Sequence, residues 1–196
     1  MSPLVESALE QAGLLQAARA RLAGDVKAAS DAEPLLRRAD LLVLGALADA
    51  LRRQECGDEV RVFLGRPAAD VLWILRGEGA RAPGLDLLRR VAMARVTSGP
   101  GARIGVDCTD AGLELSQVAL GFGATELRGA MANKRGLPIA EEATRKVKGQ
   151  GRVSASLLQQ RELGKLLLYV GRRALFVEAE GERRRSGSEL EGGHHA

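Results

Sequence analysis

Residues 85–131 read LDLLRRVAMARVTSGPGARIGVDCTDAGLELSQVALGFGATELRGAM, and this stretch decides the fold. Apolar residues recur at helical spacing over 85–96 and again over 113–121, while 102–106 and 126–131 are short apolar runs. The series predicts helix, strand, helix and strand, the alternation of an α/β protein with a parallel sheet. Turn residues follow the first of these strands, so Asp107 is expected at its carboxyl end.

The sequence before this stretch predicts three helices and a strand. Ser30 and Glu33 have the spacing of a capping box, and Pro34 stands early in the helix that would follow. Asp40 is a plausible N-cap for the long apolar helix after it. The predicted elements are a helix over 4–23, a second helix from 34, an apolar helix over 41–53 and an alternating strand over 59–64.

Two further segments complete the chain. The apolar run at 71–75 is either a strand or one turn of buried helix, which periodicity alone does not decide. Near the end, 155–169 predicts a helix and 174–177 a strand, and Gly171 separates them. Beyond Glu178 the chain is rich in charge and glycine, so it is expected to be disordered.

The composition narrows the function classes. The chain has 45% hydrophobic residues, and it lacks a long uninterrupted apolar run, which argues against a membrane protein. Its net charge is +4, but basic and acidic residues are interleaved and aromatic residues make up only 3%. Nucleic-acid binding is therefore not the favoured interpretation. The N-terminus has no basic start before an apolar core, so we expect a cytoplasmic protein with reduced thiols.

Few side chains suggest a chemical site. Asp107 and Glu126 are the candidate ligand-contacting residues, because α/β barrels place such groups at strand ends. Asp110 and Glu114 are better explained as a helix cap and a first-turn acid. No catalytic residue, metal ligand or cofactor-binding residue is predicted: the two histidines are adjacent in the tail, and the two cysteines suggest small, partly buried thiols.

Two blocks of the chain resemble a known family. The first runs over 22–63 and contains ADLLVLGALADALRRQECGDEVRVF; the second runs over 85–177 and contains LSQVALGFGATELRGAM and ELGKLLLYVGRRALFVE. Both are similar to the radical S-adenosylmethionine (SAM) enzymes of menaquinone biosynthesis by the futalosine pathway, aminofutalosine synthase and dehypoxanthine futalosine cyclase, and to FO synthase. The resemblance implies a TIM-like α/β barrel, a [4Fe–4S] cluster and SAM.

The chain also departs from that family. The family carries a CxxxCxxC motif after the first strand, whereas LGRPAADVLWILRGEGARAPG follows Phe63 here, and the whole chain holds only Cys56 and Cys108. A [4Fe–4S] cluster that binds SAM needs three thiolates. In the late GAxxLxG segment, Glu126 stands where the family commonly has aspartate and Ala130 where it commonly has threonine.

The sequence thus predicts a partial, truncated radical SAM barrel without cluster or catalysis, acting as a binding or accessory subunit. Its predicted regions are a helical lead-in with the first strand (1–63), an irregular junction (64–84), the closing part of a barrel (85–178) and a disordered tail (179–196). The edge left by a lost barrel middle would be covered by a second copy or by a complete radical SAM protein. The alternative is a small basic module for nucleic-acid or protein interaction.

Overall fold

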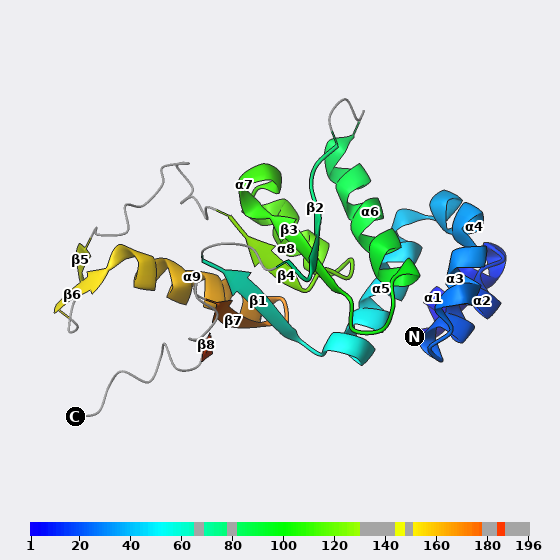
Figure 1. Ribbon diagram of the computed structural model, residues 1–196, viewed down its shortest axis with the longest axis horizontal. Helices are drawn as coiled ribbons and strands as arrows, with labels where there is room; N and C mark the ends of the chain where they lie inside the picture. Colours follow the sequence, from blue (N-terminus) through cyan, green and yellow to red (C-terminus); the bar gives the residue numbers. More distant parts are fainter. Residues whose placement is uncertain (65–68, 78–81, 130–143, 148–150, 178–183, 187–196) are drawn as a thin grey trace.

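A computed structural model describes residues 1–64, 69–77, 82–129, 144–147, 151–177 and 184–186 (Figure 1). Side chains are described for the same residues except 144–147, 151–159 and 184–186. The helices are α1 (Pro3–Gln11), α2 (Leu15–Leu22), α3 (Val26–Asp31), α4 (Glu33–Arg38), α5 (Leu41–Cys56), α6 (Pro83–Thr97), α7 (Cys108–Ala111), α8 (Leu113–Leu120) and α9 (Ala155–Tyr169). The strands are β1 (Glu59–Phe63), β2 (Val71–Ile74), β3 (Arg103–Asp107), β4 (Glu126–Arg128), β5 (Thr144–Val147), β6 (Gly151–Ser154), β7 (Arg173–Val177) and β8 (Arg184–Ser186).

A six-stranded sheet in the order β2-β3-β4-β1-β7-β8 organises the chain. Every neighbouring pair from β2 to β7 is parallel, and β8 adds an antiparallel edge. The first strand in the sequence therefore lies in the interior of the sheet, between β4 and β7. The predicted α/β class is confirmed; the sheet is open, with β2 and β8 at its two edges.

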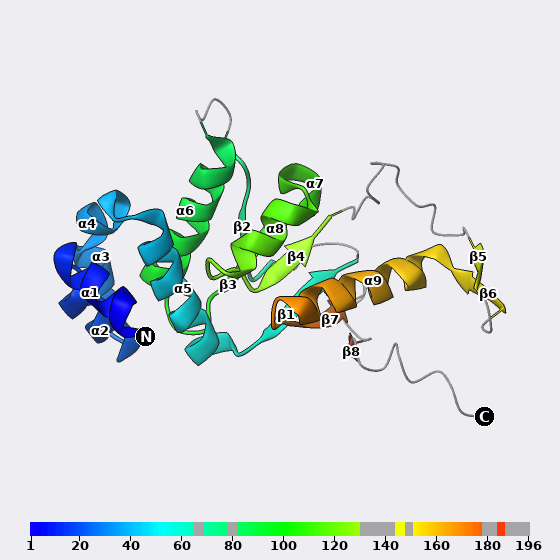
Figure 2. The same cartoon turned by 180° about the vertical axis from the view of Figure 1, so that it is seen from behind.

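Helices cover one face of this sheet. Alternate strand residues, among them Val62, Val106, Leu127 and Phe176, form an apolar core with α6, α8 and α9. The two opposite views in Figures 1 and 2 place α8 and α9 on the same side of the strands. Because side chains alternate between the two faces of a strand, the residues between these core positions point to the other face.

The N-terminal helices form a second layer at one end of the molecule (Figures 1 and 2). Leucine and alanine residues of α1 to α5 make a second apolar core, to which α6 contributes Ala92 and Val96. The preceding residue on α6, Val91, belongs to the core beneath the sheet. α6 thus connects the helical layer to the sheet.

Several local predictions are confirmed. Asp40 caps α5 by accepting from the backbone N–H groups of Leu42 and Val43 at 2.8 and 3.3 Å. α9 spans the predicted residues, 155–169. The run at 71–75, for which helix and strand were both open, contains the strand β2.

Other local predictions are wrong. The helix expected over 4–23 is divided into α1 and α2 at Gly13, whose φ of +69° interrupts the helical backbone. Ser30 lies inside α3 and donates to the carbonyl of Val26, so it forms no capping box with Glu33. The residues expected as turns after Asp107 include the short helix α7.

Part of the C-terminal region lies outside the described residues. The predicted tail falls at 179–196, of which the structure describes only 184–186; these residues form the edge strand β8. The hairpin of β5 and β6 was not expected from the sequence.

Candidate functional site

One face of the sheet is covered by none of the described helices, and we call it the helix-free face. It is formed by the strand residues that alternate with the apolar core. Its register follows from the parallel pairs, in which Trp73 lies beside Gly105, Gly105 beside Glu126, and Glu126 beside Arg61. The members used below are Arg61, Phe63, Trp73, Arg103, Gly105, Asp107, Glu126 and Arg128.

Glu126 is buried on this face between two arginines. Its side chain is 1% exposed, and its carboxylate accepts from Arg61 Nε at 2.6 Å and from Arg103 Nη1 at 3.2 Å. Burial raises the pKa of this carboxyl, because desolvation disfavours the charge, while the two guanidinium groups partly oppose the rise. Glu126 therefore orients Arg61, which comes from the neighbouring strand.

Asp107 ends β3 on the same face, as the sequence predicts. Its Oδ1 accepts from the backbone N–H of Thr109 at 2.8 Å and caps α7, and its Oδ2 accepts from Arg128 Nε at 2.9 Å. Gly129, at φ of +96°, leaves room for this arrangement, since a Cβ there would lie 2.3 Å from Asp107 Oδ1. Asp107 is thus a positioning group for Arg128.

Two aromatic rings lie between two arginines. Phe63 and Trp73 pack edge to face, with ring centroids 5.8 Å apart and an interplanar angle of 77°. The Arg61 guanidinium lies over Phe63 at 5.2 Å, and that of Arg128 lies over Trp73 at 4.4 Å. Each such contact of a cation with a ring is worth about 0.5–2 kcal/mol, more where water is excluded. These four side chains are named the aromatic–arginine stack.

Two donors in the stack are buried without a hydrogen-bond partner among the residues that the structure describes. They are Trp73 Nε1 and Arg61 Nη2. The carboxylate of Asp70 lies 3.9 Å from Arg61 Nη2, which is too long for a hydrogen bond. A buried donor without an acceptor costs about 1–3 kcal/mol, a cost that an acceptor atom of a bound molecule would remove.

The sequence predicted two members of this face and missed the stack. Asp107 and Glu126 both lie on the helix-free face, but they bond to different arginines. Arg61 and Phe63 alternate with Val60 and Val62 in the sequence EVRVF, and that alternation was the available signal for a face. Whether Asp107 or Glu126 contacts a ligand remains a prediction.

The cap predicted for Asp110 is wrong, and the role predicted for Glu114 is consistent with the fold. Gly112 precedes α8 without a side-chain cap, and Glu114 lies in its first turn. Asp110 lies in α7, where its carboxylate accepts from the backbone N–H of Arg76 at 2.6 Å. Asp110 therefore ties the end of β2 to α7.

The cysteines are separate and differ in environment. Both are free thiols; Cys56 ends α5 and is partly exposed, whereas Cys108 begins α7 and is buried. Burial raises the pKa of Cys108. A cluster with three thiolate ligands does not fit these residues. Within the described part of the chain, His, Cys, Asp and Glu form no group of three that could hold a metal ion.

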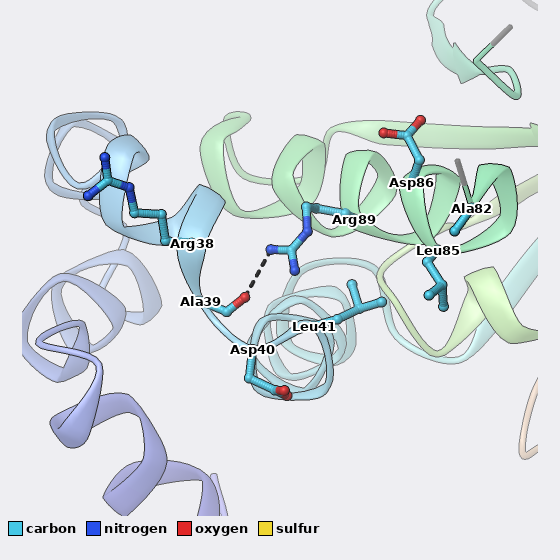
Figure 3. A pocket seen from close by; sticks show the side chains of 8 residues that line it. All are labelled: Arg38, Ala39, Asp40, Leu41, Ala82, Leu85, Asp86 and Arg89. Atoms are coloured by element: carbon cyan, nitrogen blue, oxygen red, sulfur yellow. Dashed lines mark hydrogen bonds between the residues drawn. The ribbon is translucent and has the colours of Figure 1, made fainter. Parts of the chain in front are cut away.

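A pocket of about 590 Å³ lies away from this face, between the corner that joins α4 to α5 and the first turn of α6 (Figure 3). Arg89 donates from Nη1 to the carbonyl of Ala39 at 3.0 Å and to that of Arg37 at 3.1 Å. Arg89 thus fastens the corner to α6. The residues that line the pocket are Arg38, Ala39, Asp40, Leu41, Ala82, Leu85, Asp86 and Arg89. None of them carries a buried side-chain nitrogen or oxygen atom that lacks a hydrogen-bond partner. The helix-free face is the stronger candidate site.

Comparison of the chain with models of protein families and with curated proteins gives no match. Among the described helices, none has the length and apolar character needed to cross a bilayer. The candidate site thus consists of charged and aromatic side chains on one face of the sheet, and ion pairs hold its arginines in place.

Proposed function

We propose that the chain is a degenerate relative of the radical SAM enzymes of menaquinone biosynthesis, and that it acts as a cytoplasmic binding or accessory protein without radical chemistry. The observation that carries the binding role is the pair of buried donors in the aromatic–arginine stack, Trp73 Nε1 and Arg61 Nη2, which have no hydrogen-bond acceptor in the described part of the chain. An unpaired buried donor lowers the stability of the fold. A ligand or partner that supplies the acceptor would remove this cost. The helix-free face is the surface that would bind it.

The strand order differs from that of a barrel. In a closed α/β barrel the first strand pairs in parallel with the last one. Here β1, from the first resembling block, pairs in parallel with β4, from the second, through Arg61–Glu126 and two further residue pairs. β1 pairs in parallel with β7 as well, and it lies between β4 and β7, whereas a barrel that lost only its middle strands would keep those two strands adjacent. The proposed ancestry therefore rests on the resembling residues and not on the strand order.

The donor set of the chain argues against radical initiation. In the family the cluster reduces and cleaves SAM, and three thiolates hold it. This chain has two cysteines, which lie on separate elements. The side chains of the helix-free face can instead orient a partner's carboxylate or carbonyl oxygen through guanidinium and indole N–H groups.

Anaerobic reconstitution with iron and sulfide tests the loss of catalysis. We expect no visible absorbance of a bound cluster and no cleavage of SAM under reducing conditions. Cysteine-free variants, Cys56→Ala with Cys108→Ala, should give the same spectrum as the unaltered chain. A cluster that forms in the unaltered chain and cleaves SAM would overturn the proposal.

The accessory role is tested with a partner of stated kind, a complete aminofutalosine synthase. Mixing the two proteins should give a complex in light scattering that Trp73→Phe weakens, because the substitution keeps the ring and removes the unpartnered N–H. Phe122→Leu, a change near the core on the opposite side of the sheet, serves as the control. Failure to form the complex, with salt-dependent binding to DNA instead, would favour the basic interaction module.

A further inference from the structure

The outer edge of β2 has no partner among the described strands. β2 ends the sheet, and β3 is its one described neighbour. Alternate N–H and C=O groups along an edge strand point away from the sheet, where they can pair with a strand of another chain. The edge is therefore a template for strand addition.

The residues of this edge do little to prevent such pairing. The segment 70–76 reads DVLWILR, with five consecutive apolar residues from Val71 to Leu75. Edge strands that avoid association usually carry lysine, proline or an inward charge, and none stands among these five. Leu72 is 50% exposed and Leu75 is 46% exposed. Apolar side chains are thus presented together with the backbone edge of Val71–Ile74; beyond this strand, the carbonyl of Leu75 accepts from Arg90 and the N–H of Arg76 donates to Asp110.

Opposite charges at the two ends make the segment complementary to itself. Asp70 precedes the apolar run and is 61% exposed, and Arg76 follows it and is also exposed. An antiparallel copy reverses the order of the ends, so each aspartate meets an arginine; a parallel copy in register would place like charges together. With Trp73 opposite its own counterpart, the antiparallel pairs are Asp70 with Arg76, Val71 with Leu75, and Leu72 with Ile74.

We propose that the β2 edge docks a second copy of this chain, antiparallel about a two-fold axis through the Trp73 position. About this axis the β2 edge of one protomer pairs with the β2 edge of the other. The dimer is therefore closed, and neither β2 edge remains free to bind a third copy. An edge-to-edge contact buries a small area, and a dimer of micromolar affinity is expected. The proposal does not depend on the proposed function, because it rests on the strand and not on the helix-free face.

Charge reversal at the two ends tests the register. Asp70→Arg and Arg76→Asp each place like charges opposite one another at both ends of the homodimer, so each should weaken dimerisation about tenfold. An equimolar mixture of the two variants restores both opposite-charge pairs and should form a heterodimer of wild-type affinity. Sedimentation velocity or light scattering over a concentration series gives the three dissociation constants.

The equimolar mixture also distinguishes charge repulsion between the two chains from the loss of contacts within one chain. The Asp70 carboxylate lies 3.5 Å from Arg103, and Arg76 donates to the carbonyl of Asp110. Either substitution disturbs these contacts, but adding the other variant cannot repair them. Recovery in the mixture therefore reports pairing between chains, and its absence would overturn the proposal.

A second pair of variants covers the case in which charge reversal unfolds the chain. Leu72→Lys adds a protective charge at an exposed edge position and should give a folded monomer. Leu42→Lys, at a position 73% exposed on α5, is the matched control and should leave the dimer intact. The fluorescence of Trp73, the one tryptophan, should change on dilution of the dimer. A monomeric wild-type chain, or a dimer unaffected by Leu72→Lys, would contradict the proposal.

Discussion

At Gly105, a methyl group would occupy the space of a neighbouring indole ring. A Cβ built there lies 2.4 Å from ring atoms of Trp73 and 2.8 Å from Val71 Cγ1, both on the adjacent strand. The aromatic–arginine stack therefore depends on a residue without a side chain. The same strand pair carries the edge that we propose for dimerisation.

We predict that Gly105→Ala lowers the free energy of unfolding by about 1–3 kcal/mol, the usual cost of overpacking. The indole must move, so the near-ultraviolet circular dichroism of Trp73 should change as well. Gly99→Ala is the control, because a Cβ at Gly99 has no neighbour within 4 Å. Equal stability of the two variants in urea would contradict the close approach of Gly105 to Trp73.

At the scale of elements, a buried ion cluster joins α2, α5 and α6. Glu55, 7% exposed at the end of α5, pairs with Arg21 at 2.7 Å and with Arg95 at 3.5 Å. Arg21 also donates to the carbonyl of Val96 at the C-terminus of α6, which satisfies a group that the helix leaves unpaired. Burial lowers the pKa of Arg95. One carboxylate thus holds two buried cations.

We predict that Glu55→Ala lowers the free energy of unfolding by about 3–5 kcal/mol, because it leaves two buried guanidinium groups without their counter-charge. Glu6→Ala is the matched control: Glu6 pairs with Arg19 at 3.1 Å, but both side chains are substantially exposed. Its loss should be less than about 1 kcal/mol. Urea unfolding of both variants measures the difference. Similar losses of stability would show that burial does not determine how much these ion pairs stabilise the fold.

The elements that the sequence predicted are those with strong local signals. Asp40 and the apolar stretch after it define α5, and alternation in 59–64 defines β1. Wrong predictions arose where one local pattern fitted two structures: the spacing of Ser30 and Glu33 suits a cap, yet Ser30 continues α3. Side-chain pairs such as Arg61 with Glu126 join residues 65 positions apart, and no local pattern encodes them.

At the scale of the whole molecule, two apolar cores share one helix. Val91 of α6 packs beneath the sheet, and its neighbour Ala92 packs among the N-terminal helices. Loss of either core would expose the α6 residues that pack in it. The helical layer and the sheet are therefore expected to unfold together.

We predict a single unfolding transition. The fluorescence of Trp73 reports on the sheet edge, and far-ultraviolet circular dichroism reports mainly on the helices. The two signals should give coincident urea curves at a fixed protein concentration, as expected for one cooperative unit. Loss of the helical signal at lower urea than the fluorescence change would contradict the shared helix as a coupling element.

The interior place of β1 has a consequence for synthesis on the ribosome. Its two neighbours, β4 and β7, both come later in the chain, and Glu126 follows its partner Arg61 by 65 residues. At translation rates of about 5–20 residues per second, β1 waits on the order of 3–13 s for its first neighbour. During that interval the segment VRVF lacks the neighbours that pair with it in the finished sheet, and apolar segments without their partners are prone to aggregate.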